Sequence, residues 1–301
     1  MTATSKTIVF FGNERLVSGL KTTDAPILRG LIAEGYHIAA VVSHHTDGIS
    51  RSNRKLEVAE IAHSHNIPLL LPDKPSAIID ELKKYSAIAA VLVAYGRIIP
   101  QSVIDIFPKG IINIHPSLLP KYRGPTPIET VIKNGDTETG VSIMQLTAGM
   151  DEGPVYAQLS IPLRGNETKM ALYTEIAHKS AKLLLQSLPG ILAGTLRPVP
   201  QDNSAATYSH LLKKEEALLD TKKMSASEAE RTIRAYLGFP KSKLTINGHL
   251  VVVTKAHVSH TQKTPLDIIC RDGAFVTVDE LVAPSGRHMT GEAFLRGYAA
   301  A

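Results

Sequence analysis

Asn113 and His115 stand two residues apart in an apolar run, GIINIH, that covers residues 110–115. Side chains alternate between faces along a strand, so we expect both on the same side of a sheet, at the strand end where ligands bind in open α/β folds. Pro116 lacks an N–H and ends the strand. An amide beside an imidazole suits addition to a carbonyl, because the amide stabilises an oxyanion and the imidazole moves protons. The alternative is a hydrogen-bonded polar pair without chemistry.

Asp151 lies in a glycine-bounded loop, GMDEGPVY, that spans residues 149–156. A carboxylate there could orient His115, raise its pKa and accept a proton from an attacking amine. An ordinary turn aspartate is the alternative, because Asp is common in turns. The combination of Asn-x-His with a later loop Asp favours a catalytic site.

The elements that must position these residues follow from hydrophobic spacing. Apolar runs predict five strands, at 6–12, 37–43, 67–72, 87–96 and 110–115. Helical spacing predicts helices at 25–35, 57–66 and 76–85, the last capped by Ser76. Two more strands joined by a glycine-rich loop (140–163) and a long helix (168–192) follow. Continuous aliphatic strands between amphipathic helices indicate a doubly wound, mostly parallel, Rossmann-like α/β sheet.

The pattern changes after a polar, proline-containing stretch. Ser225 and Glu228 fit a capping box that opens a helix ending near Tyr236. Short strand-like segments with Asn-Gly and Asp-Gly turns then follow, at 242–248, 249–258, 266–281 and the C-terminal 291–298. They indicate a small OB-like β-barrel. We therefore expect a catalytic domain at 1–195, a linker at 196–208 and a C-terminal domain at 209–301.

Composition limits the remaining possibilities. The 301 residues carry a net charge of +5, which fits either an ordinary surface or polyanion binding. A single cysteine, Cys270, excludes an internal disulfide and a cysteine-based zinc site. With no long apolar run and no signal-peptide pattern, we expect a cytoplasmic protein that is not embedded in a membrane. No GxGxxG or P-loop follows the first strand, so the Rossmann-like pattern does not by itself imply a dinucleotide or ATP.

Residues 113–155 closely resemble the signature of the 10-formyltetrahydrofolate-dependent formyltransferases. The SLLPKYRG stretch (117–124) is similar to their SLLPxxxG turn, and residues 91–100 are similar to their strand and loop beside the pterin. The family's glycinamide ribonucleotide transformylases stop after one domain, whereas this chain continues. Its extension, at 202–220 and 225–258, resembles the C-terminal domain of the methionyl-tRNA formyltransferases.

This resemblance implies transfer of a formyl group from N10 of 10-formyltetrahydrofolate to the α-amine of methionine on initiator methionyl-tRNA, without a metal. It implies that Asn113 and protonated His115 stabilise the oxyanion, and that Asp151 holds the imidazole and helps to take the amine's proton. The folate neighbours that it implies are Val93, Ala94, Tyr95, Gly96, Ser117, Leu118, Leu119, Pro120, Gly149, Met150 and Glu152.

The resemblance also implies tRNA contacts by basic residues in two places. The loop at 44–57 holds Arg51, Arg54 and Lys55, of which we expect Arg51 to read the acceptor stem. In the C-terminal domain the candidates are Lys213, Lys214, Arg231, Arg234, Lys241 and Lys243. Ordinary surface charge is the alternative for this second group.

The sequence departs from the family at two loops. The loop at 44–57 lacks the usual Gly-Arg-Gly-Lys-Lys pattern, and GNERLVSG (12–19) stands where Gly-Thr-Pro and an aromatic residue are usual. The alternatives to be tested are a formyltransferase for a nucleotide-sugar amine, a folate hydrolase, and a folate- or RNA-binding protein without catalysis. A monomer is expected.

Overall fold

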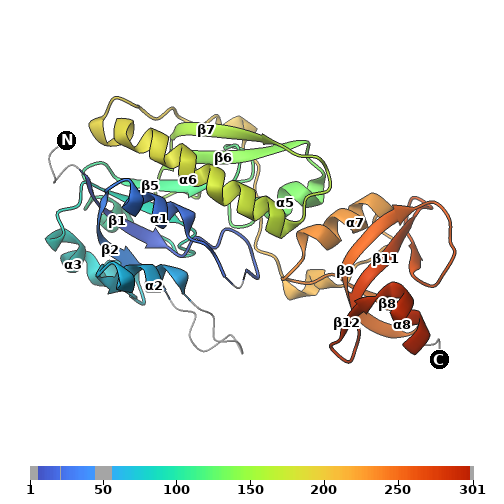
Figure 1. Ribbon diagram of the computed structural model, residues 1–301. Coiled ribbons are helices and arrows are strands. Elements are labelled where there is room, and N and C mark those ends of the chain that lie inside the picture. Colours follow the sequence, from blue (N-terminus) through green and yellow to red (C-terminus); the bar gives the residue numbers. More distant parts are fainter. Residues whose placement is uncertain (1–5, 21, 45–55, 299–301) are drawn as a thin grey trace.

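The computed structural model describes residues 6–20, 22–44 and 56–298 and contains two separate sheets (Figure 1). The larger has seven strands in the order β3-β2-β1-β4-β5-β6-β7. Strands β3, β2, β1, β4 and β5 run parallel, and β6 is antiparallel to both of its neighbours, so β7 points in the same direction as β5. This confirms the mostly parallel sheet. Their bounds are β1 (Thr7–Gly12), β2 (His37–Val42), β3 (Leu69–Leu70), β4 (Ala89–Val93), β5 (Ile111–His115), β6 (Glu138–Gln145) and β7 (Val155–Pro162).

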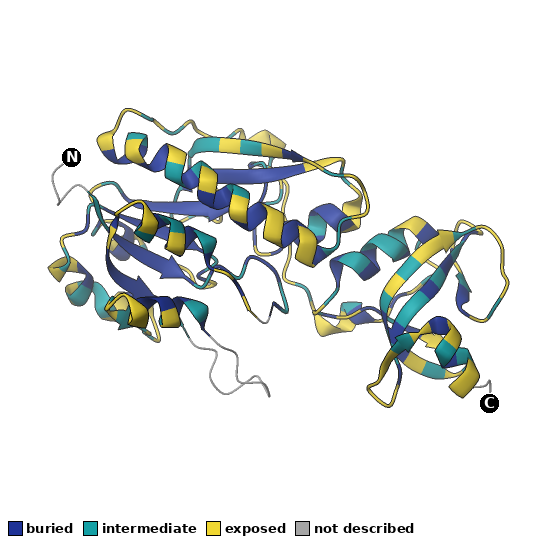
Figure 2. Ribbon diagram, in the orientation of Figure 1, coloured by how far each residue is buried: buried dark blue, intermediate teal, exposed yellow. Residues whose placement is uncertain are grey.

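Helices cover both faces of this sheet, as the doubly wound prediction requires. Their bounds are α1 (Pro26–Ala33), α2 (Glu57–Ser64), α3 (Ile79–Lys84), α4 (Gln101–Ile104), α5 (Pro127–Asn134) and α6 (Lys169–Ala193). One core lies between the sheet and α1, α2, α5 and α6. A second lies on the opposite face, under α3 and α4. Figure 2 shows the inner strands almost wholly buried between these layers.

The prediction that Ser76 caps a helix is wrong. Ser76 lies inside a 3₁₀ turn, η2 (Pro75–Ile78), and α3 begins only at Ile79. Pro75 occupies the first position of that turn. Its fixed φ favours the start of a helical turn there, and its missing N–H costs nothing because the first N–H groups of a helix have no partner within the helix. The tighter 3₁₀ turn therefore precedes the helix.

The smaller sheet is antiparallel, in the order β10-β11-β9-β8 with β12 paired to β11. It curls around its own apolar core, which confirms the OB-like expectation. Its elements are β8 (Lys243–Ile246), β9 (His249–Ser259), β10 (Asp267–Ile269), β11 (Phe275–Val282), β12 (His288–Thr290), α7 (Ala226–Ala235) and α8 (Gly291–Gly297). Two 3₁₀ turns, η3 (Asn203–Ala205) and η4 (Lys214–Ala217), precede α7.

Local sequence signals explain the ends of these elements. The capping box is present, with Glu228 N donating to Ser225 Oγ at 3.1 Å and Ser225 N donating to Glu228 Oε2 at 2.7 Å. Asn247 and Gly248 have φ of 52° and 77° and form the tight turn between β8 and β9. The C-terminal segment at 291–298, grouped with the strands above, is instead largely helix α8. Thr290 caps it by accepting a hydrogen bond from Ala293 N.

The two bodies contact each other through α5 and α7, which lie side by side (Figure 1). Lys169, at the start of α6, is fully buried, and its ammonium lies 3.6 Å from the Glu129 carboxylate. It donates to Ser18 O at 2.8 Å and to Phe239 O at 3.0 Å, so it ties the loop after β1 to the second body. Nearby the backbones of Gly19 and Gly238 touch: a Cβ on Gly19 would lie 2.7 Å from Gly238 C.

Candidate active site

Strand β5 delivers Asn113 and His115 to the same face of the large sheet, 6% and 4% exposed. Asn113 pairs with Leu92 of β4 on one side and with Met144 of β6 on the other. Two polar side chains in an inner strand are costly unless they are satisfied or used. Within the described part of the chain, the Asn113 amide makes no hydrogen bond, so its donor remains available for a substrate.

The His115 ring lies between two acceptors. Its Nε2 is 2.9 Å from Tyr122 O, and because a carbonyl only accepts, Nε2 carries the proton. Its Nδ1 faces Asp151 Oδ2 at 3.6 Å. Nδ1 is therefore the ring atom that can exchange a proton with Asp151 or with a substrate. The structure thus brings the three predicted catalytic residues together.

The loop that carries Asp151 folds back from the end of β6 over the sheet. Gln145 N donates to Pro154 O at 2.9 Å, and Gly153 lies so close that a Cβ there would overlap Gln145 O. Asp151 itself has φ of 51°, in the left-handed region, and its Oδ2 accepts a hydrogen bond from Gly124 N at 2.8 Å. The carboxylate is held by the loop that follows β5.

That loop, residues 116–124, is anchored to β6. Ser142 Oγ donates to Ser117 O at 2.7 Å and accepts from Leu119 N at 3.0 Å. Leu118 packs on Gly140, where a Cβ would lie 2.4 Å from its side chain, so only glycine fits there. Of the folate neighbours implied by the sequence, Ser117, Leu118 and Leu119 therefore lie in a loop that is fixed to β6.

The folate neighbours after β4 differ in orientation. The Val93 side chain belongs to the core on the α1 and α6 side, which is the face opposite Asn113. Tyr95 is 1% exposed, packs edge-on against Phe11 at 5.5 Å between ring centroids, and its hydroxyl has no partner among the described residues. Ala94 and Gly96 have φ of 51° and 74°, which turn the chain outward.

Two apolar side chains stay exposed on loops that follow strands of the large sheet. Ile98, in the loop after β4, is 87% exposed, and Met150, beside Asp151, is 61% exposed. Glu152 is half exposed, and its side chain packs over Gly149. Exposed apolar groups beside buried polar ones are typical of a site for a ring-containing ligand.

The unusual loop after β1 contains a buried carboxylate. Glu14 is 1% exposed and accepts hydrogen bonds from Ile27 N at 3.0 Å and Leu28 N at 2.8 Å. It thereby caps α1, whose own N-cap residue, Ala25, supplies no side-chain bond. Burial raises the pKa of Glu14 to about 7, although the two backbone N–H groups oppose this. The atypical loop thus supplies the cap of α1, a role for Glu14 that the sequence alone did not reveal.

The predicted tRNA-binding residues fall into three groups. Arg51, Arg54 and Lys55 lie outside the described residues. Lys213, Lys214 and Lys241 are exposed on the second body, and Lys243 is half-buried.

Arg231 and Arg234 instead face the first body. Arg231 Nε donates to Lys133 O at 3.1 Å, and Arg234 Nη1 donates to Glu167 O at 2.7 Å. Arg234 also forms a two-pronged ion pair with Glu230, with Nε 2.6 Å from Oε1. Both guanidinium groups therefore join the two bodies.

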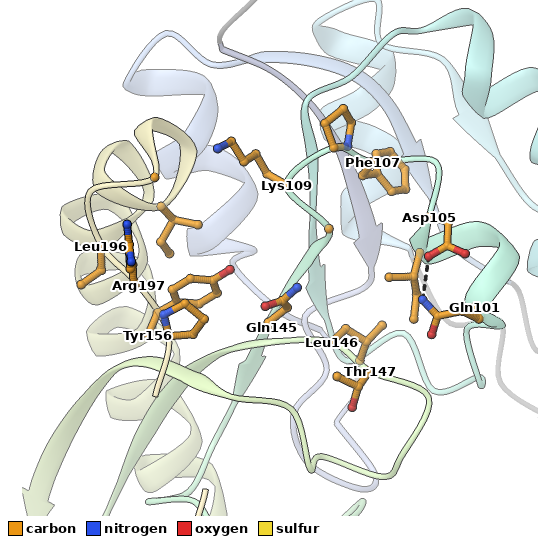
Figure 3. A pocket seen from close by; sticks show the side chains of 16 residues that line it. Gln101, Asp105, Phe107, Lys109, Gln145, Leu146, Thr147, Tyr156, Leu196 and Arg197 are labelled. Atoms are coloured by element: carbon orange, nitrogen blue, oxygen red, sulfur yellow. Dashed lines mark hydrogen bonds between the residues drawn. The ribbon is translucent and has the colours of Figure 1, made fainter. Parts of the chain in front are cut away.

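A separate hollow of about 540 Å³ lies at the other end of β5 (Figure 3). It is bounded by α4 on one side and by the end of α6 and the segment after it on the other, with Gln145, Leu146 and Thr147 between them. Leu146 and Thr147 begin the loop that leads to Asp151. One loop therefore connects this hollow with Asp151, although the hollow lies at the opposite end of β5 from His115.

The described residues offer neither a metal-binding cluster nor a membrane-spanning helix. Residues 6–20, 22–44 and 56–298 contain no group of three or more His, Cys, Asp or Glu side chains placed to hold a metal ion. None of the helices in these ranges is long and apolar enough to cross a membrane.

Comparison with known proteins places this site in a family. A family model described as formyl transferase matches residues 14–188, and one described as formyl transferase, C-terminal domain, matches residues 211–299. The chain therefore belongs to the formyl transferase family. The resemblance inferred from residues 113–155 is confirmed.

Within that family the chain is similar to proteins named methionyl-tRNA formyltransferase. The one from Pelobacter propionicus is 32% identical over 307 residues, which cover 97% of this chain and 93% of the relative. The one from Lactobacillus delbrueckii subsp. bulgaricus is 37% identical over 251 residues, covering 82% and 79%.

Solved structures share the fold. The N-formyltransferase from Helicobacter canadensis, in complex with folinic acid and dTDP-3-aminofucose, has a TM-score of 0.69 at 21% identity and covers 91% of this chain and 98% of that one. HypX from Aquifex aeolicus, in complex with tetrahydrofolic acid, has a TM-score of 0.67 at 17% identity, covering 97% and 47%.

Proposed function

We propose that this protein transfers the formyl group of 10-formyltetrahydrofolate to the α-amino group of methionine on initiator methionyl-tRNA. The buried arrangement of Asn113, His115 and Asp151, with 3.6 Å between the imidazole and the carboxylate, carries the proposal. Relatives that match at least four-fifths of the chain at 32% and 37% identity carry the name of that activity, which supports the choice of acceptor.

The residues divide the reaction between them. The amine attacks the formyl carbon, and the unpaired Asn113 amide donates to the oxyanion that forms. His115 Nδ1 and Asp151 accept the proton that the amine loses. The C–N10 bond then breaks, and a proton returns to N10 of the folate. Every step is a proton transfer or an acyl transfer.

The folate proposal rests on the loops beside the trio. Ile98 and Met150 offer exposed apolar surface for the pterin, and the backbone at 94–96 and 149–152 offers hydrogen-bonding groups to its polar edge. Val93 contributes through its backbone, because its side chain points into the opposite core. Leu119 and Pro120 complete the wall behind Ser117.

The second body supplies the tRNA surface in this proposal. We assign residues 1–195 to catalysis, 196–208 to the connection and 209–301 to tRNA binding, in a monomer that works in the cytoplasm. Exposed Lys213, Lys214 and Lys241 would contact phosphates, and Arg51, Arg54 and Lys55 would meet the acceptor stem. Arg231 and Arg234 bond to the first body and would act mainly by holding the second body in place. Lys243 is half-buried and would contribute less to phosphate binding than the exposed lysines.

A formylation assay tests the proposal. Purified protein is mixed with 10-formyltetrahydrofolate and either charged initiator tRNA, the same tRNA with a paired first acceptor-stem position, or a dTDP-amino sugar. We expect formylation of the first, a lower rate with the second and none of the sugar. Formylation of the amino sugar alone would identify a nucleotide-sugar enzyme instead, and formate release without an acceptor would identify a hydrolase.

A further inference from the structure

The segment that connects the two bodies runs directly behind the catalytic loops. Thr207 N donates to Pro120 O at 3.2 Å, and Arg123 N donates to Thr207 O at 2.9 Å. Thr207 Oγ1 also accepts from Tyr122 N at 2.9 Å, and Tyr122 O is the acceptor for His115 Nε2. The segment is therefore part of the support for the imidazole and is not a free linker.

Gln201 in this segment holds the backbone of the Asp151 loop. Its Nε2 donates to Asp151 O and to Gly153 O, both at 2.7 Å, which uses both hydrogens of the amide. Asp151 has a left-handed backbone, with φ of 51°, which is unfavourable for a residue other than glycine. Such a conformation persists only where surrounding contacts fix it, and the two hydrogen bonds from Gln201 fix this one.

Arg123 fixes the orientation of the Gln201 amide. Its side chain is almost fully buried, at 2% exposed, and its Nε and Nη2 donate to Gln201 Oε1 at 3.1 and 2.9 Å. Because the amide oxygen is held by the guanidinium, the amide nitrogen must face Asp151. A buried charge is tolerated only when it is paired and hydrogen-bonded, so Arg123 in turn depends on these acceptors.

Gly124, the residue after Arg123, holds the side chain of Asp151. Gly124 N donates to Asp151 Oδ2 at 2.8 Å, and the same oxygen faces His115 Nδ1 at 3.6 Å. Asp151 is thus held at its backbone through Gln201 and at its carboxylate through Gly124. Both contacts depend on Arg123, because Arg123 orients Gln201 and Gly124 is the next residue in the chain.

We propose that Gln201, oriented by Arg123, is a positioning residue for Asp151 and sets the distance between its carboxylate and the His115 imidazole. The inference deepens the proposed function and rests on it. Gln201 therefore links the connecting segment to the Asp151 loop, and a shift of Gln201 alters proton transfer.

The test compares Gln201→Glu with the wild-type protein in the formylation assay. A glutamate has the same shape and can pair with Arg123, but it cannot donate to Asp151 O or Gly153 O. A displacement of about 1 Å at a reacting group can cost about 100-fold in rate. We expect kcat to fall about 10- to 100-fold, with KM for tRNA and for folate within about twofold. We also expect the pH profile of kcat to change, because the Asp151 carboxylate moves relative to the His115 imidazole.

Two further variants make the result decisive. Gln201→Asn, one methylene shorter, cannot span both carbonyls and should show the same kcat defect. Asp202→Ala removes an exposed side chain that bonds within its own turn, to Ser204 N at 2.9 Å, and should keep kcat within about twofold.

The outcomes separate the two proposals. If the wild-type protein formylates charged tRNA and both Gln201 variants keep kcat within threefold, the positioning role is wrong and the proposed function stands. A kcat loss of equal size at every pH, accompanied by a lower melting temperature, would also overturn it, because Gln201 would then be merely structural. If the wild-type protein does not formylate charged tRNA, the proposed function itself fails.

Discussion

Polar groups are used in opposite ways at the rim of the large sheet and on the surface of the second body. At the rim, Asn113, His115 and Arg123 are buried, and the latter two are fixed by hydrogen bonds between 2.7 and 3.1 Å. On the second body, Lys214 and Lys241 are exposed. Buried groups gain their effect from fixed geometry, whereas exposed cations act through summed, salt-screened attraction. Changes at the first should be large and specific, and changes at the second small and additive.

The largest expected effect is at Lys169, where the first body meets the second. Lys169→Met leaves Glu129 as a buried, unpaired carboxylate, and removing one partner of a buried pair typically costs about 3–5 kcal/mol. Denaturant unfolding measures it. Lys179→Met is the matched control, because this exposed lysine on the same helix pairs with Glu175 at 3.6 Å and should cost about 0.5 kcal/mol or less. Equal losses of unfolding free energy in the two variants would show that buried and exposed charged pairs do not differ in this protein.

Asn113→Ala should have the next largest effect, and this effect should be on kcat and not on the free energy of unfolding. Loss of one oxyanion donor typically lowers kcat by about 10²–10³. Steady-state formylation kinetics check this, with circular dichroism to verify folding. Asn113→Asp keeps the shape and replaces the donor with an acceptor, so it should be at least as slow. A fast Asn113→Asp enzyme would mean that shape, and not donation, is what the site requires.

Glu14 sharpens the comparison because it is a buried acid outside the catalytic trio. Burial raises its pKa from 4.5 to about 7, so the folded state holds the proton more tightly than the unfolded state does. Stability from this group is therefore full below pH 4.5 and is lost as the pH rises through 7. The shift corresponds to about 3 kcal/mol. Glu14→Gln should flatten the fall in unfolding free energy over this range, and an unchanged slope would refute the assignment.

The surface cations should show the smallest effects. Replacing Lys213, Lys214 and Lys241 with alanine should weaken tRNA binding and reduce the slope of log K against log salt by about 1 for each lost phosphate contact. Filter binding at several salt concentrations measures the slope, and kcat at saturating tRNA should stay unchanged. A large kcat loss in the triple variant would mean that these lysines act at the reaction centre.

The sequence predicted the trio because the two-residue strand period fixes Asn113 and His115 on one face and the family signature supplies Asp151. It could not predict Arg123 or Gln201, because their roles arise between segments far apart in the chain that obey no period. The contacts of Arg231 and Arg234 with the first body could not be predicted from the sequence either. Charge alone cannot tell a phosphate contact from a contact between two bodies.

The touching backbones of Gly19 and Gly238 constrain how this enzyme can be recombined with its relatives. Gly19 has no space for a side chain against Gly238, and Gly238 has a φ of 83°, which favours glycine. Grafting a C-terminal body from a homologue therefore requires glycine at 19 and a residue that accepts this backbone at 238. Chimeras made without that match would be forced apart beside the buried Lys169, and their C-terminal body would be displaced from the large sheet.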